Sequence, residues 1–158
     1  MRKFFYGLGI FAAIVIVAGG IGFFVLARNG AALDTASKAY VKDSVVTIAT
    51  NWDSNELWKR ASPHLRTMAK QEELRGFFDA ARDALGPLVE YRGSQGQSLM
   101  SVVNSQSRVS ASYVAQCHFQ KGDAVIQVAL VKQGDTWMIE GFHINSSVLM
   151  KRLVGLKS

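Results

Sequence analysis

The sequence predicts an α+β domain, in which helices pack on one face of an antiparallel sheet, preceded by a transmembrane helix. Three observations lead to this class. Residues 4–27 carry no charge, residues 34–85 repeat apolar side chains at helical spacing, and the spacing changes to alternation after Pro87. A run of helices followed by a run of strands with short turns is typical of α+β folds.

The uncharged run at residues 4–27 is long enough to cross a bilayer, which takes about 20 residues. A cleaved signal peptide is the alternative, and Ala27 would close an acceptable cleavage site, but its apolar core spans only about 7–15 residues. Arg2 and Lys3 precede the run and favour a cytoplasmic N-terminus. We therefore expect residues 1–28 to be a transmembrane anchor with a short cytoplasmic tail, and the rest of the chain to be exoplasmic.

The first two helices follow from apolar spacing and from capping residues. The first helix is predicted to start at Asp34 or Thr35, either of which can act as an N-cap, and to end within residues 51–53. A second, short helix has Asp53 as its N-cap and stops at Pro63. These two helices open the soluble domain.

The third helix has the clearest periodicity and ends at Gly86 and Pro87. Alternating segments then predict strands at residues 88–93, 98–103, 108–119, 124–132 and 136–145, with a loop between the first two. The side chains expected in the core between helices and sheet include Phe77, Phe78, Leu85, Tyr113 and Trp137.

The chain carries a formal net charge of +6, yet the domain itself is balanced. The excess cations of the chain lie near its two ends and are Arg2, Lys3, Arg28, Lys151, Arg152 and Lys157. A neutral domain lacks the basic surface that phosphate backbones select, so no nucleic-acid partner is expected. Residues 147–158 are expected to be a basic C-terminal tail, and the basic ends suit anionic lipid.

The order of elements resembles the nuclear-transport-factor-2-like fold of the cystatin-like cone superfamily, in which a curved sheet wraps around helices. Motifs at residues 61–63 (Ala-Ser-Pro) and 82–88 (ending Gly-Pro-Leu) and the closing strand are similar to those of a bacterial family of secreted or membrane-anchored domains of unknown function. The closing strand departs from that family at Phe142, where the family has Tyr. The resemblance covers about residues 40–145; it implies a cone-like domain at residues 29–146 and supplies no catalytic residues.

The resemblance also implies an alternative, because some members of this wider fold resemble isomerases and dehydratases. Such enzymes have a carboxylate and a tyrosine or histidine inside the cone. That chemistry needs a carboxyl group in an apolar pocket. We expect Tyr91, Tyr113, Trp137 and His143 to be candidates for lining a ligand pocket, because strict alternation along the last strand turns Trp137 and His143 inward. We assign no catalytic residue.

The same alternation turns Met138, Glu140, Phe142 and Ile144 outward. A contiguous exposed apolar row usually marks a contact, so these four residues are candidates for the interface of a homodimer or of a complex with an envelope partner.

The sequence contains no motif that names a reaction. Its single cysteine, Cys117, allows no internal disulfide, and its three histidines show no metal-site spacing, so neither a metal nor a cofactor is expected. The function we expect is that of a non-enzymatic domain on a bacterial inner membrane, facing the periplasm and binding a partner protein or a small apolar ligand. A cone-pocket isomerase or hydratase and a structural subunit of an envelope assembly are the alternatives.

Overall fold

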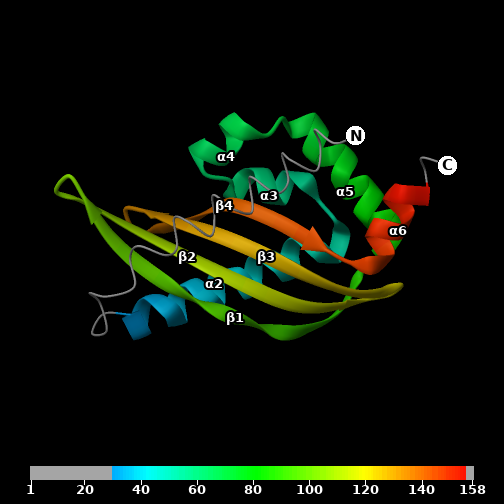
Figure 1. The fold of residues 1–158 in the computed structure, drawn as a ribbon, viewed down its shortest axis with the longest axis horizontal. Helices are drawn as coiled ribbons and strands as arrows, with labels where there is room; N and C mark the ends of the chain where they lie inside the picture. The colour runs from blue at the N-terminus through cyan, green and yellow to red at the C-terminus, as the bar shows by residue number, and fades with distance from the viewer. Residues whose placement is uncertain (1–29, 156–158) are drawn as a thin grey trace.

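The computed structural model describes residues 30–155, which form five helices and a four-stranded antiparallel sheet (Figure 1). The predicted α+β class is thereby confirmed. In chain order the elements are α2 (Gly30–Asn51), α3 (Ser54–Arg60), α4 (Pro63–Met68), α5 (Gln71–Leu85), β1 (Leu88–Val103), β2 (Gln106–Phe119), β3 (Gly122–Gln133), β4 (Thr136–Asn145) and α6 (Ser147–Gly155).

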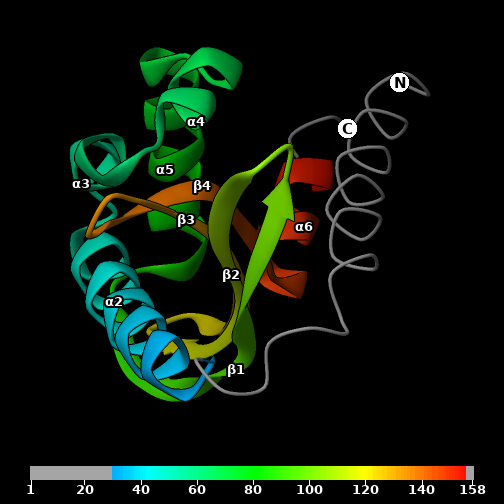
Figure 2. The same cartoon turned by 90° about the vertical axis from the view of Figure 1, so that its left-hand side faces the viewer.

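The sheet is a simple meander in the order β1-β2-β3-β4, with each strand antiparallel to the next. It is strongly curved, and α2 and α3 to α5 lie on the same side of it (Figure 2). Helix α2 packs mainly along β1, while α6 packs against α5 and β3. The hydrophobic core lies between these helices and the inner face of the sheet.

Trp52 connects several parts of the core. It follows α2 in a left-handed conformation with φ of 50°. Its indole N–H donates to the carbonyl of Gly86 at 2.7 Å, which ties the end of α2 to the end of α5. Its ring stacks on Phe119 at 5.2 Å and meets Phe78 edge-on at 5.8 Å. Arg82 donates to the Trp52 carbonyl at 3.1 Å, a favourable place for a cation because helix C-termini carry partial negative charge.

One helix was not predicted. Pro63 was expected to end the second helix, and α3 does end before it, but Pro63 then begins α4. The Ser62 hydroxyl accepts from the backbone N–H of Leu65 at 3.1 Å and caps this helix. Proline suits a first helical turn because its missing N–H would have no partner there.

The loop predicted between residues 93 and 98 is also absent, since the two strands expected on either side of it form the single strand β1. Gly93 and Gly96 allow this because both have positive φ, of 116° and 157°. A Cβ on Gly96 would lie 2.0 Å from the backbone oxygen of Ser112, so this close strand pairing requires glycine.

Strand β4 contains an irregularity that changes which side chains face the core. Leu130 pairs with Ile139 and Ala129 pairs with Gly141, so Glu140 is an extra residue on β4. Such a bulge reverses the inward and outward positions that follow it. Trp137 and Ile139 face the core before the bulge, and Phe142 and Ile144 join it afterwards.

The ends of the domain bear on two expectations. Residues 147–155 of the expected basic tail form α6, whose Leu149 is buried in the core. Within residues 30–155, no helix combines the length and apolar character needed to cross a bilayer. The expected anchor at residues 4–27 lies outside the described residues.

Candidate functional site

The four residues expected to line a pocket lie in different surroundings. Tyr113 is 1% exposed; its hydroxyl lies 2.8 Å from that of Ser37 and donates to the Asp34 carbonyl at 3.1 Å. Burial raises the pKa of Tyr113, so its phenol stays neutral. Trp137 is 8% exposed and belongs to the core, whereas His143 is exposed. The inward position expected for His143 was wrong because the bulge at Glu140 reverses the alternation.

The apolar outward row expected on β4 was wrong for the same reason. The ring of Phe142 lies 5.9 Å from that of Phe78 in the core, and Ile144 is only 6% exposed. Met138 is half-buried. Glu140 is held by Arg108, whose terminal nitrogen donates to both carboxylate oxygens at 2.6 and 2.8 Å. The dimer surface inferred from this row therefore has no support.

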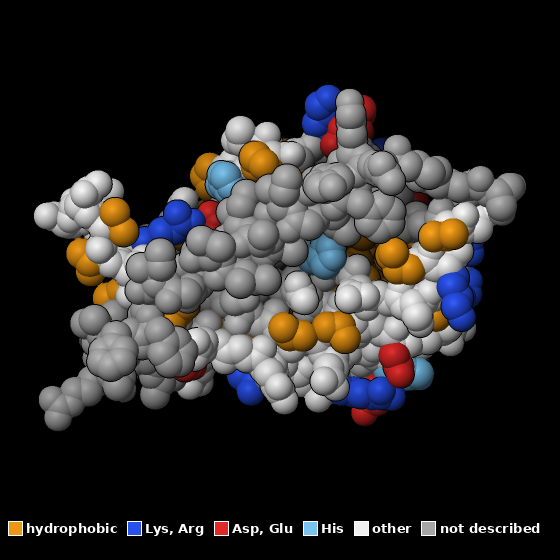
Figure 3. Space-filling view, in the orientation of Figure 1, with side chains coloured by type: hydrophobic (Ala, Val, Ile, Leu, Met, Phe, Trp, Pro, Cys, Tyr) orange, Lys and Arg blue, Asp and Glu red, His pale blue; other side chains and the backbone are white. Residues whose placement is uncertain are grey.

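The interior of the described domain is packed with apolar side chains. The buried polar residues in this part of the chain are all serines: Ser37, Ser44, Ser54, Ser62, Ser94 and Ser146. Two hollows at the surface have room for a ligand. On the face shown in Figure 3, cationic side chains lie in separate small groups, as the balanced charge of the domain suggests.

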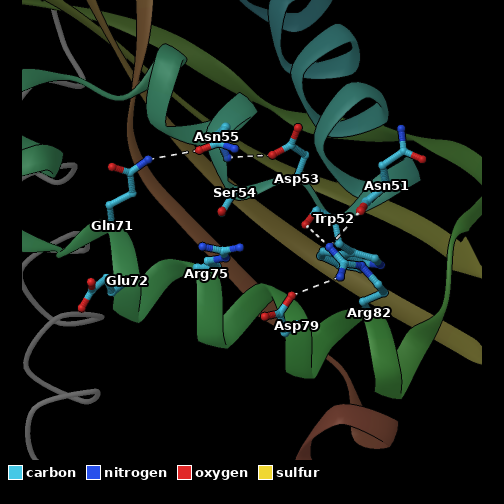
Figure 4. A pocket seen from close by; sticks show the side chains of 10 residues that line it. All are labelled: Asn51, Trp52, Asp53, Ser54, Asn55, Gln71, Glu72, Arg75, Asp79 and Arg82. Atoms are coloured by element: carbon cyan, nitrogen blue, oxygen red, sulfur yellow. Dashed lines mark hydrogen bonds and ion pairs between the residues drawn. The ribbon is translucent and has the colours of Figure 1, made fainter.

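The larger hollow, which we call the α3–α5 groove, has a volume of about 660 Å³ and lies between the end of α2, the start of α3 and one face of α5 (Figure 4). Its lining is polar and of mixed charge, consisting of Asn51, Trp52, Asp53, Ser54, Asn55, Gln71, Glu72, Arg75, Asp79 and Arg82.

Most polar groups of the α3–α5 groove hold the helices together. Asp53 caps α3 by accepting from the backbone N–H of Asn55 at 2.9 Å, as predicted, and Gln71 donates to the Asn55 side chain at 3.1 Å. Arg82 is bound by Asp79 at 3.1 Å while it caps α2. Arg75 points into the groove and has no ion-pair partner among the described residues (Figure 4). Anionic and cationic side chains are mixed along the walls of this groove.

The second hollow has a volume of about 490 Å³ and lies between α2 and the edge strand β1. We call it the basic groove, because every charged residue that lines it is a cation. Its residues are Thr35, Lys38, Ala39 and Lys42 of α2, and Tyr91, Arg92, Gly93 and Ser94 of β1.

Local structure explains how these residues meet. The four α2 residues are spaced i, i+3, i+4 and i+7 and therefore form one stripe of the helix beside its buried face. On β1, the pairing with β2 shifts between Tyr91 and Gly93. This irregularity lets Tyr91 and Ser94, which are three positions apart, both turn toward α2.

Two neighbouring hydroxyl groups, those of Tyr91 and Ser94, lie beneath the surface of the basic groove. Ser94 is 7% exposed, and neither its Oγ nor the hydroxyl oxygen of Tyr91 makes a hydrogen bond of good geometry within residues 30–155. Burial raises the pKa of Tyr91, and the neighbouring Ser94 hydroxyl partly opposes that increase. Buried polar groups normally have a hydrogen-bond partner, and the two neighbouring hydroxyls are the polar groups nearest to each other in this position.

The three cations of the groove differ in whether they form ion pairs. Arg92 contacts the carboxylates of Glu90 at 3.2 Å and of Asp123 at 3.5 Å. Lys38 and Lys42 are exposed and make no ion pair within the described residues. Of the sequence-predicted pocket residues, only Tyr91 lines this groove. The two lysines are one helical turn apart in the sequence, but their neighbour β1 is about 50 residues away, so spacing alone did not reveal the site.

Metal and thiol chemistry have no visible basis in this part of the chain. Residues 30–155 contain no group of three His, Cys, Asp or Glu side chains placed to hold a metal ion. Cys117 is buried, and burial raises the pKa of its thiol to about 12, so it is not a nucleophile near neutral pH. Comparison of the chain with known protein families and with curated proteins gave no match.

Proposed function

We propose that this protein is a non-catalytic binding domain with a nuclear-transport-factor-2-like cone, held on a single-pass anchor at residues 4–27 and facing the periplasm of a bacterium. The observation that carries the proposal is the basic groove, an open hollow whose charged lining residues are all cations and which has the Tyr91 and Ser94 hydroxyls beneath its surface. This groove suits a ligand with an anionic group better than the purely apolar ligand expected from the sequence.

The packed interior supports binding over catalysis. The acid–base chemistry of cone-pocket enzymes depends on a carboxyl group whose pKa is raised by an apolar pocket. In the described part of the chain the buried polar side chains are serines, and the carboxylate on β4, Glu140, is paired with Arg108 at the surface. A homodimer through β4 is not part of the proposal, because Phe142 and Ile144 face the core.

The start of α2 supports attachment to an anchor. The Asp34 carboxylate accepts from the backbone N–H of Ser98 at 2.6 Å and from the Ser98 hydroxyl, and the Asp34 carbonyl accepts from Tyr113. These contacts fasten the first turns of α2 to β1 and β2. A helix continuing from a membrane segment would therefore hold the whole domain in a defined position.

One end of the domain is suited to face the bilayer. The β1–β2 hairpin tip carries Val102 and Val103, which are 67% and 63% exposed. This tip and the beginning of α2 lie at the same end of the molecule (Figure 1). Exposed apolar side chains are favourable at a lipid surface, so an anchor entering at Gly30 would bring this tip toward the membrane.

The topology is tested by fusing a fluorescent reporter that works only in the cytoplasm, or a phosphatase that works only in the periplasm, after Ser158. We expect phosphatase activity and no fluorescence. As a control, replacing Arg2 and Lys3 with glutamate removes the positive charges that favour a cytoplasmic N-terminus and should reduce the asymmetry. Strong fluorescence from the native chain would contradict the topology, and a mature N-terminus at Arg28 would contradict the retained anchor.

A further inference from the structure

We infer that the basic groove is a binding site for a phosphate-type oxyanion, carried either by a lipid headgroup or by a soluble phosphate compound. The inference names the ligand chemistry of the groove and therefore rests on the proposed binding function.

The two free lysines provide the charge. Lys38 and Lys42 are four residues apart on α2, a spacing that places Cβ atoms about 5–6 Å apart on one helix face. Two ammonium groups at this spacing repel each other, and no described carboxylate pairs with either of them. One oxyanion between them would remove the repulsion and accept hydrogen bonds from both. The charge of Arg92 is balanced by Glu90 and Asp123, so Lys38 and Lys42 are the cations left for a ligand.

The hydroxyls at the floor provide directed donors. Ser94 and Tyr91 line the groove, and their hydroxyls, which neighbour each other, make no hydrogen bond of good geometry to the rest of the described residues. Because burial raises the pKa of Tyr91, its phenol stays protonated at neutral pH and can donate. Both hydroxyl oxygens are almost completely covered from solvent, so an oxyanion in the groove would accept hydrogen bonds from them only after a rotation of the Ser94 or Tyr91 side chain. An apolar ligand would make no such bond.

The donor set favours phosphate over carboxylate. Carboxylates are bound most specifically by the planar fork of arginine, whereas lysine binds phosphate as a point charge. Here the arginine is already paired with two carboxylates, and the unengaged donors are the ammonium groups of Lys38 and Lys42 and the two hydroxyls. A phosphate group has several acceptor oxygens and can therefore bond to both lysines at once.

The position of the two lysines along α2 distinguishes between a lipid phosphate and a soluble phosphate compound. With a rise of about 1.5 Å per residue, Lys38 and Lys42 lie about 12 and 18 Å along α2 from Gly30. The headgroup layer of one leaflet is only about 5–7 Å thick. A lipid phosphate therefore reaches the groove only if α2 lies along the membrane surface, whereas a soluble phosphate compound reaches it in any orientation.

The experiment titrates the full-length chain, purified in a non-ionic detergent and phosphate-free buffer, with two probes followed by calorimetry. The probes are inorganic phosphate and dihexanoyl phosphatidylglycerol below its micelle concentration. Saturable binding of either probe is expected. The Lys38→Gln/Lys42→Gln double variant should weaken it about tenfold or more, because charge-assisted hydrogen bonds are lost.

Two further variants make the result specific to the groove. Ser94→Ala should weaken binding several-fold while circular dichroism shows an unchanged fold. The Lys70→Gln/Lys151→Gln variant makes the same change in net charge at exposed lysines outside the groove, and it should bind like the native chain.

Binding of inorganic phosphate assigns a soluble ligand, and binding of the lipid alone assigns a headgroup. The inference is overturned if neither probe binds saturably, or if the control lysine pair weakens binding as much as the groove pair does. A cytoplasmic reporter signal combined with groove-specific phosphate binding would overturn the proposed topology and leave the inference standing.

Discussion

Replacing Phe78 with alanine tests the central packing contact between α5 and the rest of the core. The side chain is 1% exposed and lies among three aromatic rings, those of Trp52, Phe142 and Phe77, at centroid distances of 5.8, 5.9 and 6.2 Å. Phe78 therefore joins the end of α2, the second half of β4 and its own helix.

The expected loss of stability follows from this environment. Phenylalanine-to-alanine changes in packed cores cost about 3–5 kcal/mol. Because each aromatic pair adds about 0.5–1.5 kcal/mol beyond area burial, the upper half of that range is expected here. For a domain of this size the melting temperature should fall by roughly 10–20 °C.

The assay is urea unfolding of the full-length chain in non-ionic detergent, followed by circular dichroism and tryptophan fluorescence. Trp52 should report the change, since its ring contacts Phe78 directly. Phe77→Ala is the matched control, because this ring is on the same helix but only half-buried, and it should cost clearly less. A loss below about 1 kcal/mol for Phe78→Ala, or a larger loss for Phe77→Ala, would refute the assignment of the buried face of α5.

Three further predictions concern β4 and β2. Phe142→Asp should unfold the domain rather than release a folded monomer, because Phe142 packs against the core. His143→Asp changes the next residue, which is exposed, and should leave the circular dichroism spectrum unchanged. Equal behaviour of the two variants would argue against the bulge. A double-mutant cycle on Arg108→Ala and Glu140→Gln should give a coupling of about 0.2–1 kcal/mol that declines with salt, since the arginine is exposed, and a salt-independent value would not fit. Cys117 should resist thiol reagents until the chain unfolds. Burial raises the pKa of the folded Cys117 thiol to about 12, so the stability that this thiol contributes should be complete below the pKa of the unfolded thiol and should fall as the pH rises above that value. Cys117→Ala should therefore weaken the loss of stability at alkaline pH. Rapid labelling of the native protein would contradict the burial of Cys117.

The helix caps and the buried helix face that were predicted from neighbouring residues are confirmed by the structure. Asp53 caps α3 through its side chain, and Gly86 ends α5 with a left-handed φ of 73°. Phe78 and Leu85 are buried on the predicted face of α5. These features depend on residues within a few positions of one another, and helical periodicity and capping act over that range.

The candidate site was harder to foresee. Tyr91 was expected to line a pocket and does line the basic groove, but Tyr113 and Trp137 are parts of the core and His143 is exposed. Nothing in the sequence distinguishes Lys38 and Lys42 from the other lysines on the exposed faces of helices.

By itself, therefore, the sequence determined the α+β class, the capped helices and most of the buried faces, because propensity and periodicity are properties of short segments. Tertiary structure alone decided the bulge at Glu140 and the single long strand β1. Both depend on strand register, which is set by contacts between distant backbones such as Gly96 and Ser112. It also decided the basic groove, since the charge of Lys38 and Lys42 acquires a binding geometry only where α2 lies against β1.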